Sequence, residues 1–143
     1  MKKILSLLAC LLLCVAANAQ SVKVVVNSKT GEVVGRYVRT NANYYIVEIQ
    51  DEARVPKAGH KVVTYSAANG NGILYCKDWG AVNVRQQPNT SSPVIGKAIY
   101  EKGYVPETYP CLGLSNGWYK TEIGGRIGYV KANFMIWDVM DSF

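Results

Sequence analysis

The chain has 143 residues, of which 16 are basic and 10 acidic, and its formal net charge at pH 7 is +6. The basic residues are spread along the chain, whereas a nucleic-acid-binding protein usually concentrates them on one stripe, so this composition argues against a nucleic-acid partner. One histidine and a few distant cysteines do not have the spacing of a zinc site, so no metal is expected.

The first 19 residues have the pattern of a secretory signal peptide. Lys2 and Lys3 precede an apolar run from Ile4 to Ala16, and Ala17-Asn18-Ala19 places small residues where a signal peptidase reads them. The apolar run is about 13 residues long, shorter than the ~20 needed to span a bilayer. We therefore expect cleavage after Ala19 and a secreted or periplasmic protein with no transmembrane segment.

Lipoprotein processing at Cys10 or Cys14 is the alternative fate of this segment. Leu13 is large for a residue that precedes a lipidated cysteine, and Cys10 leaves almost no apolar run before it. Cleavage at residue 19 leaves 124 residues, with 14 basic and 10 acidic side chains and a net charge of +4. A charge of this size is usually a solubility feature.

After cleavage only two cysteines remain, Cys76 and Cys111. Outside the cytoplasm a lone pair is a disulfide candidate. The bond would close a loop of about 35 residues, a stabilisation of roughly 3–4 kcal/mol in the chain-entropy model. Two buried thiols that pack as small apolar side chains are the alternative, and both readings stay open.

The chain beyond residue 20 reads as a series of short strands. No segment keeps apolar residues at helical spacing over three turns. Runs of β-branched and aromatic residues recur between Gly, Asn and Pro, which is typical of a small antiparallel barrel or sandwich. In chain order the predicted strands are Val22–Val26, Val33–Arg39, Tyr44–Ile49, Lys61–Tyr65, Ile73–Cys76, Val82–Arg85, Val94–Tyr100, Val105–Leu112, Trp118–Ile123 and Ile127–Val130.

Turn residues separate several of these strands. Lys29-Thr30-Gly31-Glu32, Ser115-Asn116-Gly117 and Gly124-Gly125 are typical of tight hairpins. The small residues of 67–72 predict a loop or linker, which divides the chain into a small antiparallel β meander or subdomain at 20–77 and a second unit at 78–143. The first unit could be independent or could cover the edges of the second. Its small size favours packing.

Four sequence pieces between about Ala81 and Trp137 form one pattern. They are Ala81-Val82-Asn83-Val84-Arg85 with the following loop and Val94-Ile95-Gly96, then Lys102-Gly103-Tyr104-Val105, Asn116-Gly117-Trp118-Tyr119-Lys120, and the segment from Gly124 to Phe134. Together they resemble bacterial SH3-like (SH3b) domains. They occur in family order and at family-like spacing. The resemblance implies an all-β protein whose C-terminal half is a five-stranded SH3-like barrel.

The resemblance also implies a ligand groove between the first long loop and the loop before the Trp strand. It would place Tyr109, Trp118, Asn133 and Phe134 near that groove. For each aromatic residue the alternative is core packing.

Three departures from signalling SH3 domains change the expected ligand. Gln86–Ser92 contains no acid to hold a basic ligand residue, Lys131 stands where those domains usually have proline, and Phe134 replaces a groove tyrosine. A proline-rich peptide is therefore disfavoured. The resemblance to bacterial domains implies a cell-wall peptide or glycan, or an envelope protein.

No residue set in the chain argues for catalysis. The single histidine, His60, lies in a loop-like segment, and both remaining cysteines are in the other half. A nucleophile–base–orienter set needs three converging groups, and no cofactor motif precedes a predicted helix. We therefore expect a non-catalytic binding module without a cofactor.

A structural or protein-interaction subunit is the alternative function, acting through an exposed β edge such as Tyr44–Ile49. The same segment and Val33-Val34-Gly35-Arg36 are weakly similar to two segments of the C-terminal half, Trp118–Ile123 and Val94–Lys97. The spacing between them is shorter by about one hairpin, so a chance similarity of amphipathic strands is favoured over a second complete barrel.

Overall fold

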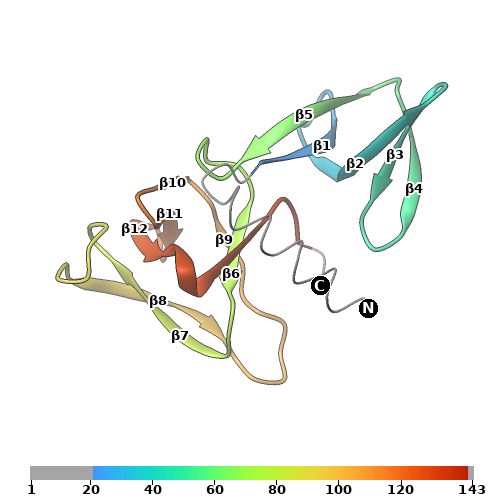
Figure 1. The fold of residues 1–143 in the computed structure, drawn as a ribbon. Coiled ribbons are helices and arrows are strands. Elements are labelled where there is room, and N and C mark those ends of the chain that lie inside the picture. Colours follow the sequence, from blue (N-terminus) through green and yellow to red (C-terminus); the bar gives the residue numbers. More distant parts are fainter. Residues whose placement is uncertain (1–20, 142–143) are drawn as a thin grey trace.

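A computed structural model describes residues 21–141. The predicted signal segment, with Cys10 and Cys14, lies outside the described residues. The described part contains thirteen β-strands and one 3-10 turn but no α-helix, which confirms the predicted all-β class. None of it forms a helix with the length and apolarity that a membrane span requires. Figure 1 shows two bodies, an N-terminal sheet and a C-terminal barrel.

The N-terminal body is one five-stranded antiparallel sheet with the order β4-β3-β2-β1-β5. Its strands are β1 (Ser21–Asn27), β2 (Val33–Asn41), β3 (Tyr44–Glu48), β4 (Glu52–Pro56) and β5 (His60–Ser66). Strand β4 was not predicted, because Glu52-Ala53-Arg54 is polar and has little β-propensity. It forms by pairing with β3 along its whole length.

Strand β1 is buried on both faces. Val25 packs with Val47 and Val55 on one side of the sheet, whereas Val24 and Val26 belong to a separate cluster on the other side. A strand covered on both faces reads as a continuous apolar run, which accounts for the three consecutive valines.

The C-terminal body contains two sheets with the orders β10-β11-β12-β7-β8 and β13-β6-β9. Its elements are β6 (Ile73–Cys76), β7 (Gly80–Arg85), β8 (Val94–Tyr100), β9 (Tyr109–Pro110), β10 (Gly113–Ser115), β11 (Trp118–Ile123), β12 (Arg126–Lys131), the 3-10 turn η2 (Ala132–Phe134) and β13 (Met135–Asp138). The sheets enclose one core that contains Leu74, Val84, Tyr119 and Val130.

Two predicted hairpins have the expected geometry. Asn116 and Gly117 connect β10 to β11 with φ values of 51° and 79°, and Gly124 and Gly125 connect β11 to β12 with values of 54° and 76°. Both central residues of a type I′ turn need positive φ, and such turns match the twist of the strands they join.

The C-terminal body begins earlier than predicted. The predicted boundary at residues 77 and 78 and the predicted start of the barrel at Ala81 both exclude β6, but β6 pairs with β13 and β9. Leu74 and Cys76 of this strand are buried in the barrel core.

The predicted strand Val105–Leu112 is much shorter in the structure. Only Tyr109–Pro110 of it is a strand, and Val105 is 66 % exposed.

The strands of the N-terminal sheet and five strand positions of the barrel follow each other in the same spatial order. The N–H groups of Cys111 and Leu112 bond to the carbonyls of Gly72 and Lys120, so β9 and β10 together lie between β6 and β11. The barrel order β13-β6-β9/β10-β11-β12 thus repeats the order β5-β1-β2-β3-β4. The long hairpin β7–β8 is present only in the C-terminal body.

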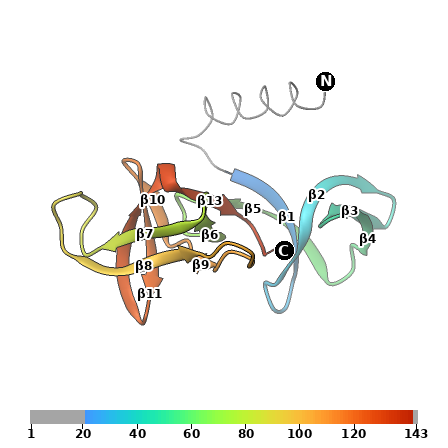
Figure 2. The ribbon, with the colours of Figure 1, turned by 90° about the horizontal axis from the view of Figure 1, so that it is seen from below.

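The end of the chain joins the two bodies. Val139 packs between Val24 and Val26 of β1, and Trp137 contacts both this cluster and the barrel core. Figure 2 shows the red strand β13 running from the barrel toward the N-terminal sheet. The N-terminal sheet therefore packs against the C-terminal unit. A sheet of this size has little core of its own to bury, so this packing is expected.

Candidate functional site

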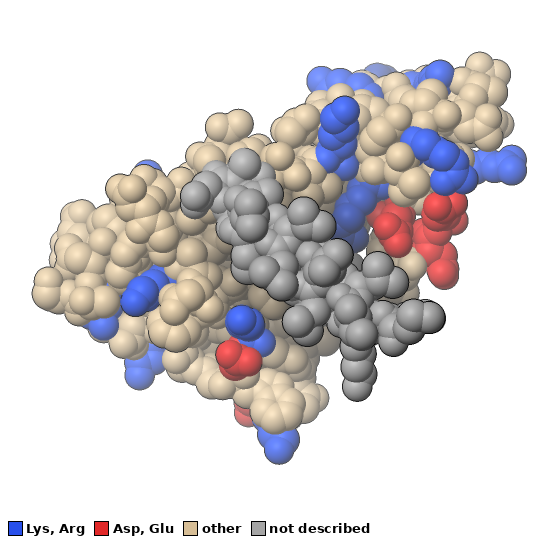
Figure 3. All heavy atoms as spheres, viewed as in Figure 1, with Lys and Arg blue, Asp and Glu red and all other residues tan. Residues whose placement is uncertain are grey.

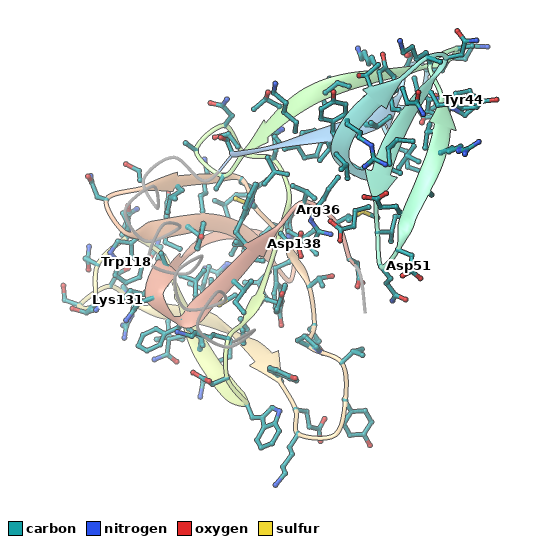
Figure 4. The ribbon with its side chains drawn as sticks, turned by 45° about the vertical axis from the view of Figure 1, so that its right-hand side comes forward. Arg36, Tyr44, Asp51, Trp118, Lys131 and Asp138 are labelled. Atoms are coloured by element: carbon teal, nitrogen blue, oxygen red, sulfur yellow. The ribbon has the colours of Figure 1, made fainter. Side chains whose placement is uncertain are left out.

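The outer face of β11 and β12 carries the candidate site. Tyr119, Thr121 and Val130 point into the barrel and are buried. Side chains alternate between the two faces of a strand, so Trp118 and Lys131, which are direct partners in the register, share the opposite face. Figure 4 shows these two residues next to each other on the outer side of the barrel.

Two hollows flank Trp118. The first has a volume of about 250 Å³ and is lined by residues that include Arg85, Thr90, Trp118, Lys131 and Phe134. The second has a volume of about 380 Å³, and its lining includes Pro88, Leu114, Trp118, Lys120 and Tyr129. We call them the Phe134 hollow and the Leu114 hollow. Trp118 borders both, so one extended ligand could contact its ring from either side.

The loop between β7 and β8 is held by its own hydrogen bonds. Ser92 is buried, and its carbonyl oxygen accepts a bond of 2.8 Å from Arg85 Nη1. The backbone N–H of Gln87 donates to Ser92 Oγ at 2.8 Å, and that of Gln86 donates to the Pro93 carbonyl at 2.9 Å. The loop can therefore present Pro88 and Thr90 to the two hollows without first becoming ordered.

The candidate face is positively charged. Arg85, Lys120 and Lys131 line the hollows, and none of the lining residues is acidic. Among residues 21–141, no carboxylate forms an ion pair with any of these three side chains. In Figure 3 the barrel end of the molecule carries blue side chains and no red ones at the left of the view.

The predicted groove residues separate into two groups. Trp118 and Phe134 line the same hollow, and Phe134 is 48 % exposed, so neither is only a core residue. Asn133 is exposed in η2 but lines neither hollow. Tyr109 is not part of this face.

Tyr109 has a structural role between β8 and β9. Its hydroxyl accepts a hydrogen bond of 2.9 Å from the Ile99 N–H and donates one of 2.8 Å to Glu107. Burial, assisted by the adjacent Glu107 carboxylate, raises the pKa of Tyr109 to about 12. Tyr109 was predicted near the groove, but it lines neither hollow and packs against the barrel core.

Several residues of the face were not predicted, among them Arg85, Lys120, Tyr129 and Lys131. Their positions follow from the register, in which Tyr129 is opposite both Lys120 and Arg85. Side chains alternate between the two faces of the strands that Gly124-Gly125 connects, and a two-residue hairpin fixes which residues are opposite each other. This pattern could have placed Lys120 and Tyr129 together on the outer face.

The two cysteines are free thiols in the described structure, and both are buried. The Cys111 N–H, just after β9, bonds to the carbonyl of Gly72, just before β6, whereas Cys76 lies at the far end of β6, four residues after Gly72. At about 3.3 Å per residue the two Cα atoms are about 13 Å apart, beyond the ~7 Å that a disulfide spans. Burial raises the pKa of both thiols.

The remaining chemistry-bearing residues are dispersed. His60 lies in the N-terminal sheet, where its Nδ1 is 2.9 Å from the Pro56 carbonyl oxygen. Across residues 21–141 no three His, Cys, Asp or Glu side chains come together as metal ligands would.

A family model matches part of the chain. The model of the bacterial SH3 domain family matches residues 80–135, the segment that forms the hairpin β7–β8, the strands β9 to β12 and the start of β13. No curated protein matches the chain. Residues 80–135 of this chain therefore carry a bacterial SH3 domain, and such a domain suggests a binding module.

Proposed function

We propose that the protein is an exported, non-catalytic module that binds cell-wall peptide or glycan, or an envelope protein, through the face around Trp118. The observation that carries the proposal is the position of Trp118, half-buried between two hollows on the outer face of the barrel. Aromatic side chains with this partial exposure provide apolar contact area at little entropic cost, as in other recognition surfaces.

The environment of this face supports a wall ligand over a proline-rich peptide. The β7–β8 loop brings Pro88 and Thr90 to the hollows but no carboxylate to hold a basic peptide residue. The signal pattern of residues 1–19 would deliver the chain to the compartment where wall material is present.

The alternative of binding through an exposed β edge at Tyr44–Ile49 is not retained. Strand β3 lies between β2 and β4, so its backbone groups are already paired. The edge strand next to it, β4, carries Glu52 and Arg54 and ends at Pro56, all of which oppose the addition of another strand.

Retention on purified peptidoglycan sacculi tests the proposal. Residues 20–143 should sediment with sacculi, and Trp118→Ala and Phe134→Ala should each reduce the bound fraction while the far-UV circular dichroism stays that of the wild type. Trp79→Ala is the matched control, since Trp79 is 59 % exposed and lines neither hollow. If the wild-type protein stays in the supernatant with sacculi and with their soluble fragments, the proposal is wrong.

A further inference from the structure

Cationic and aromatic side chains alternate across the face that Trp118 occupies. Lys131 is directly opposite Trp118, and one step along the same strands Tyr129 lies between Lys120 and Arg85. Successive residues on one face of a strand are about 6.6 Å apart, so each aromatic ring has an ammonium or guanidinium group on the neighbouring strand. We name these five residues the cationic stripe.

The charge of the stripe is not neutralised by the protein. Arg85 uses part of its guanidinium to hold the Ser92 carbonyl, but Lys120 and Lys131 have no carboxylate partner among residues 21–141. The Glu122 carboxylate is on the same strand face as Lys120, but the register places it opposite Ile127, beyond the aromatic residues. Neither hollow includes an acidic residue in its lining.

We propose that the stripe selects a carboxylate-bearing ligand, namely a wall glycopeptide strand with free carboxylates. This inference rests on the proposed function and names the chemical class of its ligand. A sugar ring or an acyl chain contacts Trp118, and a carboxylate of the same strand binds Lys131 in the Phe134 hollow. Lys120 and Arg85 receive a second carboxylate along the strand, beside Tyr129.

The geometry favours this ligand over a single-stranded nucleic acid, which also combines stacking with positive charge. The stripe offers only three cations, and each is next to an aromatic ring rather than in a continuous track for a phosphate backbone. The two hollows, of about 250 and 380 Å³, are both lined by Trp118 and suit separate substituents of a branched strand.

Chemical blocking of the ligand tests the proposal. Soluble wall glycopeptides are prepared in two forms, one with free carboxylates and one in which these groups are converted to neutral amides. The wild-type protein should bind the amidated form about tenfold more weakly or worse, because a neutral amide cannot form the charge-assisted hydrogen bonds that a carboxylate forms with lysine and arginine. Binding of the free form should weaken when salt rises from low to molar concentration, since the stripe is exposed.

A charge reversal locates the effect on the protein. Lys131→Glu should reduce affinity for the free form by about tenfold or more and should remove most of the preference for it. Lys61→Glu changes the net charge equally but lies on β5 of the N-terminal sheet, so it should bind as the wild type does.

The outcomes separate the two proposals. If both forms bind equally and Lys131→Glu behaves like Lys61→Glu, the carboxylate inference is wrong while wall binding stands. If neither form binds and sacculi do not retain the protein, wall binding itself fails. If single-stranded DNA displaces the free glycopeptide and binds more tightly than it does, the stripe is a nucleic-acid site and the inference is overturned.

Discussion

Arg36 of the N-terminal sheet and Asp138 at the end of the barrel form an ion pair with an Nη2–Oδ1 distance of 2.6 Å, and the two residues are 102 positions apart in the sequence. The same Oδ1 accepts a hydrogen bond of 2.6 Å from the backbone N–H of Val139. Figure 4 shows the pair at the junction of the two bodies. The pair thus fixes the chain end whose Val139 covers the valines of β1.

Breaking this pair should destabilise the whole molecule. Asp138→Ala removes both the ion pair and the bond to Val139, and Arg36→Ala removes the ion pair alone. We expect losses in the free energy of unfolding of about 2 and about 1 kcal/mol, because the pair is partly screened from water. Urea unfolding at pH 7 measures both.

Arg39→Ala is the matched control for these variants. Arg39 pairs with Glu52 at 3.1 Å, but the two side chains are 56 % and 52 % exposed, against 28 % and 18 % for Arg36 and Asp138. Exposed pairs contribute about 0–1 kcal/mol, so this change should be the smallest of the three. Equal effects in all three variants would mean that the junction has no special role.

Gly128→Ala should destabilise the barrel by about 1–3 kcal/mol, the usual range for overpacking. An added Cβ would lie 2.5 Å from Val84 Cγ1 and 2.9 Å from Ile95 Cδ1. Gly96→Ala should be milder, because the atoms nearest its added Cβ belong to the Ile123 side chain, the first of them at 3.1 Å. Thermal melts of the two variants compare them, and a Gly128→Ala protein as stable as the wild type would contradict the packing described.

The hydroxyl of Tyr109 should make stability depend on alkaline pH. Because the pKa of Tyr109 is about 12 in the folded chain and about 10 when unfolded, the unfolded chain loses this proton first as pH rises. The part of the folding stability that comes from the raised pKa of Tyr109 is therefore complete below pH 10 and is lost between about pH 10 and 12. Tyr109→Phe lacks this proton, so its stability should fall less over that window.

At pH 7 the Tyr109→Phe variant should be less stable by about 1 kcal/mol, since the Ile99 N–H and Glu107 lose their partner. Tyr104→Phe, at a ring that is 69 % exposed, should match the wild type at this pH. Urea midpoints at several pH values test both statements. A Tyr109→Phe curve parallel to the wild-type curve from pH 10 to 12 would refute the assignment.

Both thiols should be present and unreactive in the folded protein. Cys76 and Cys111 are 0 % and 1 % exposed, and burial raises their pKa, so little thiolate is available to a thiol reagent. We expect almost no reaction at neutral pH and two thiols titrated in urea without reductant. No titratable thiol in urea would demonstrate a disulfide and a different β6–β9 register.

The sequence predicted most strands of the barrel and the family whose model matches residues 80–135, because these depend on local pattern and turn chemistry. Asn116-Gly117 and Gly124-Gly125 determine their hairpins within a few residues. The partners of Ile73–Cys76 could not be predicted in this way. Strand β6 pairs with β13, about 60 residues later, and alternation shows which face is apolar but not which strand is adjacent.

The candidate site was predicted only in part for the same reason. Trp118 and Phe134 were identified from the family resemblance, and they line one hollow. Lys131 was noticed only as a departure from proline, because its place opposite Trp118 requires the β11–β12 register. Tyr109 was misplaced because an aromatic residue near a groove loop has the same local pattern whether it points outward or into the core.

The location of the ligand on the folded protein is the most direct test of the account. Soluble wall glycopeptides are titrated into the ¹⁵N-labelled protein, and amide and indole chemical shifts are followed by NMR. The account predicts that the largest changes occur at the Trp118 indole N–H and at the backbone of β11, β12 and the Gln86–Ser92 loop. Changes confined to β4, β5 or Trp79, with the Trp118 signals unmoved at saturation, would contradict it.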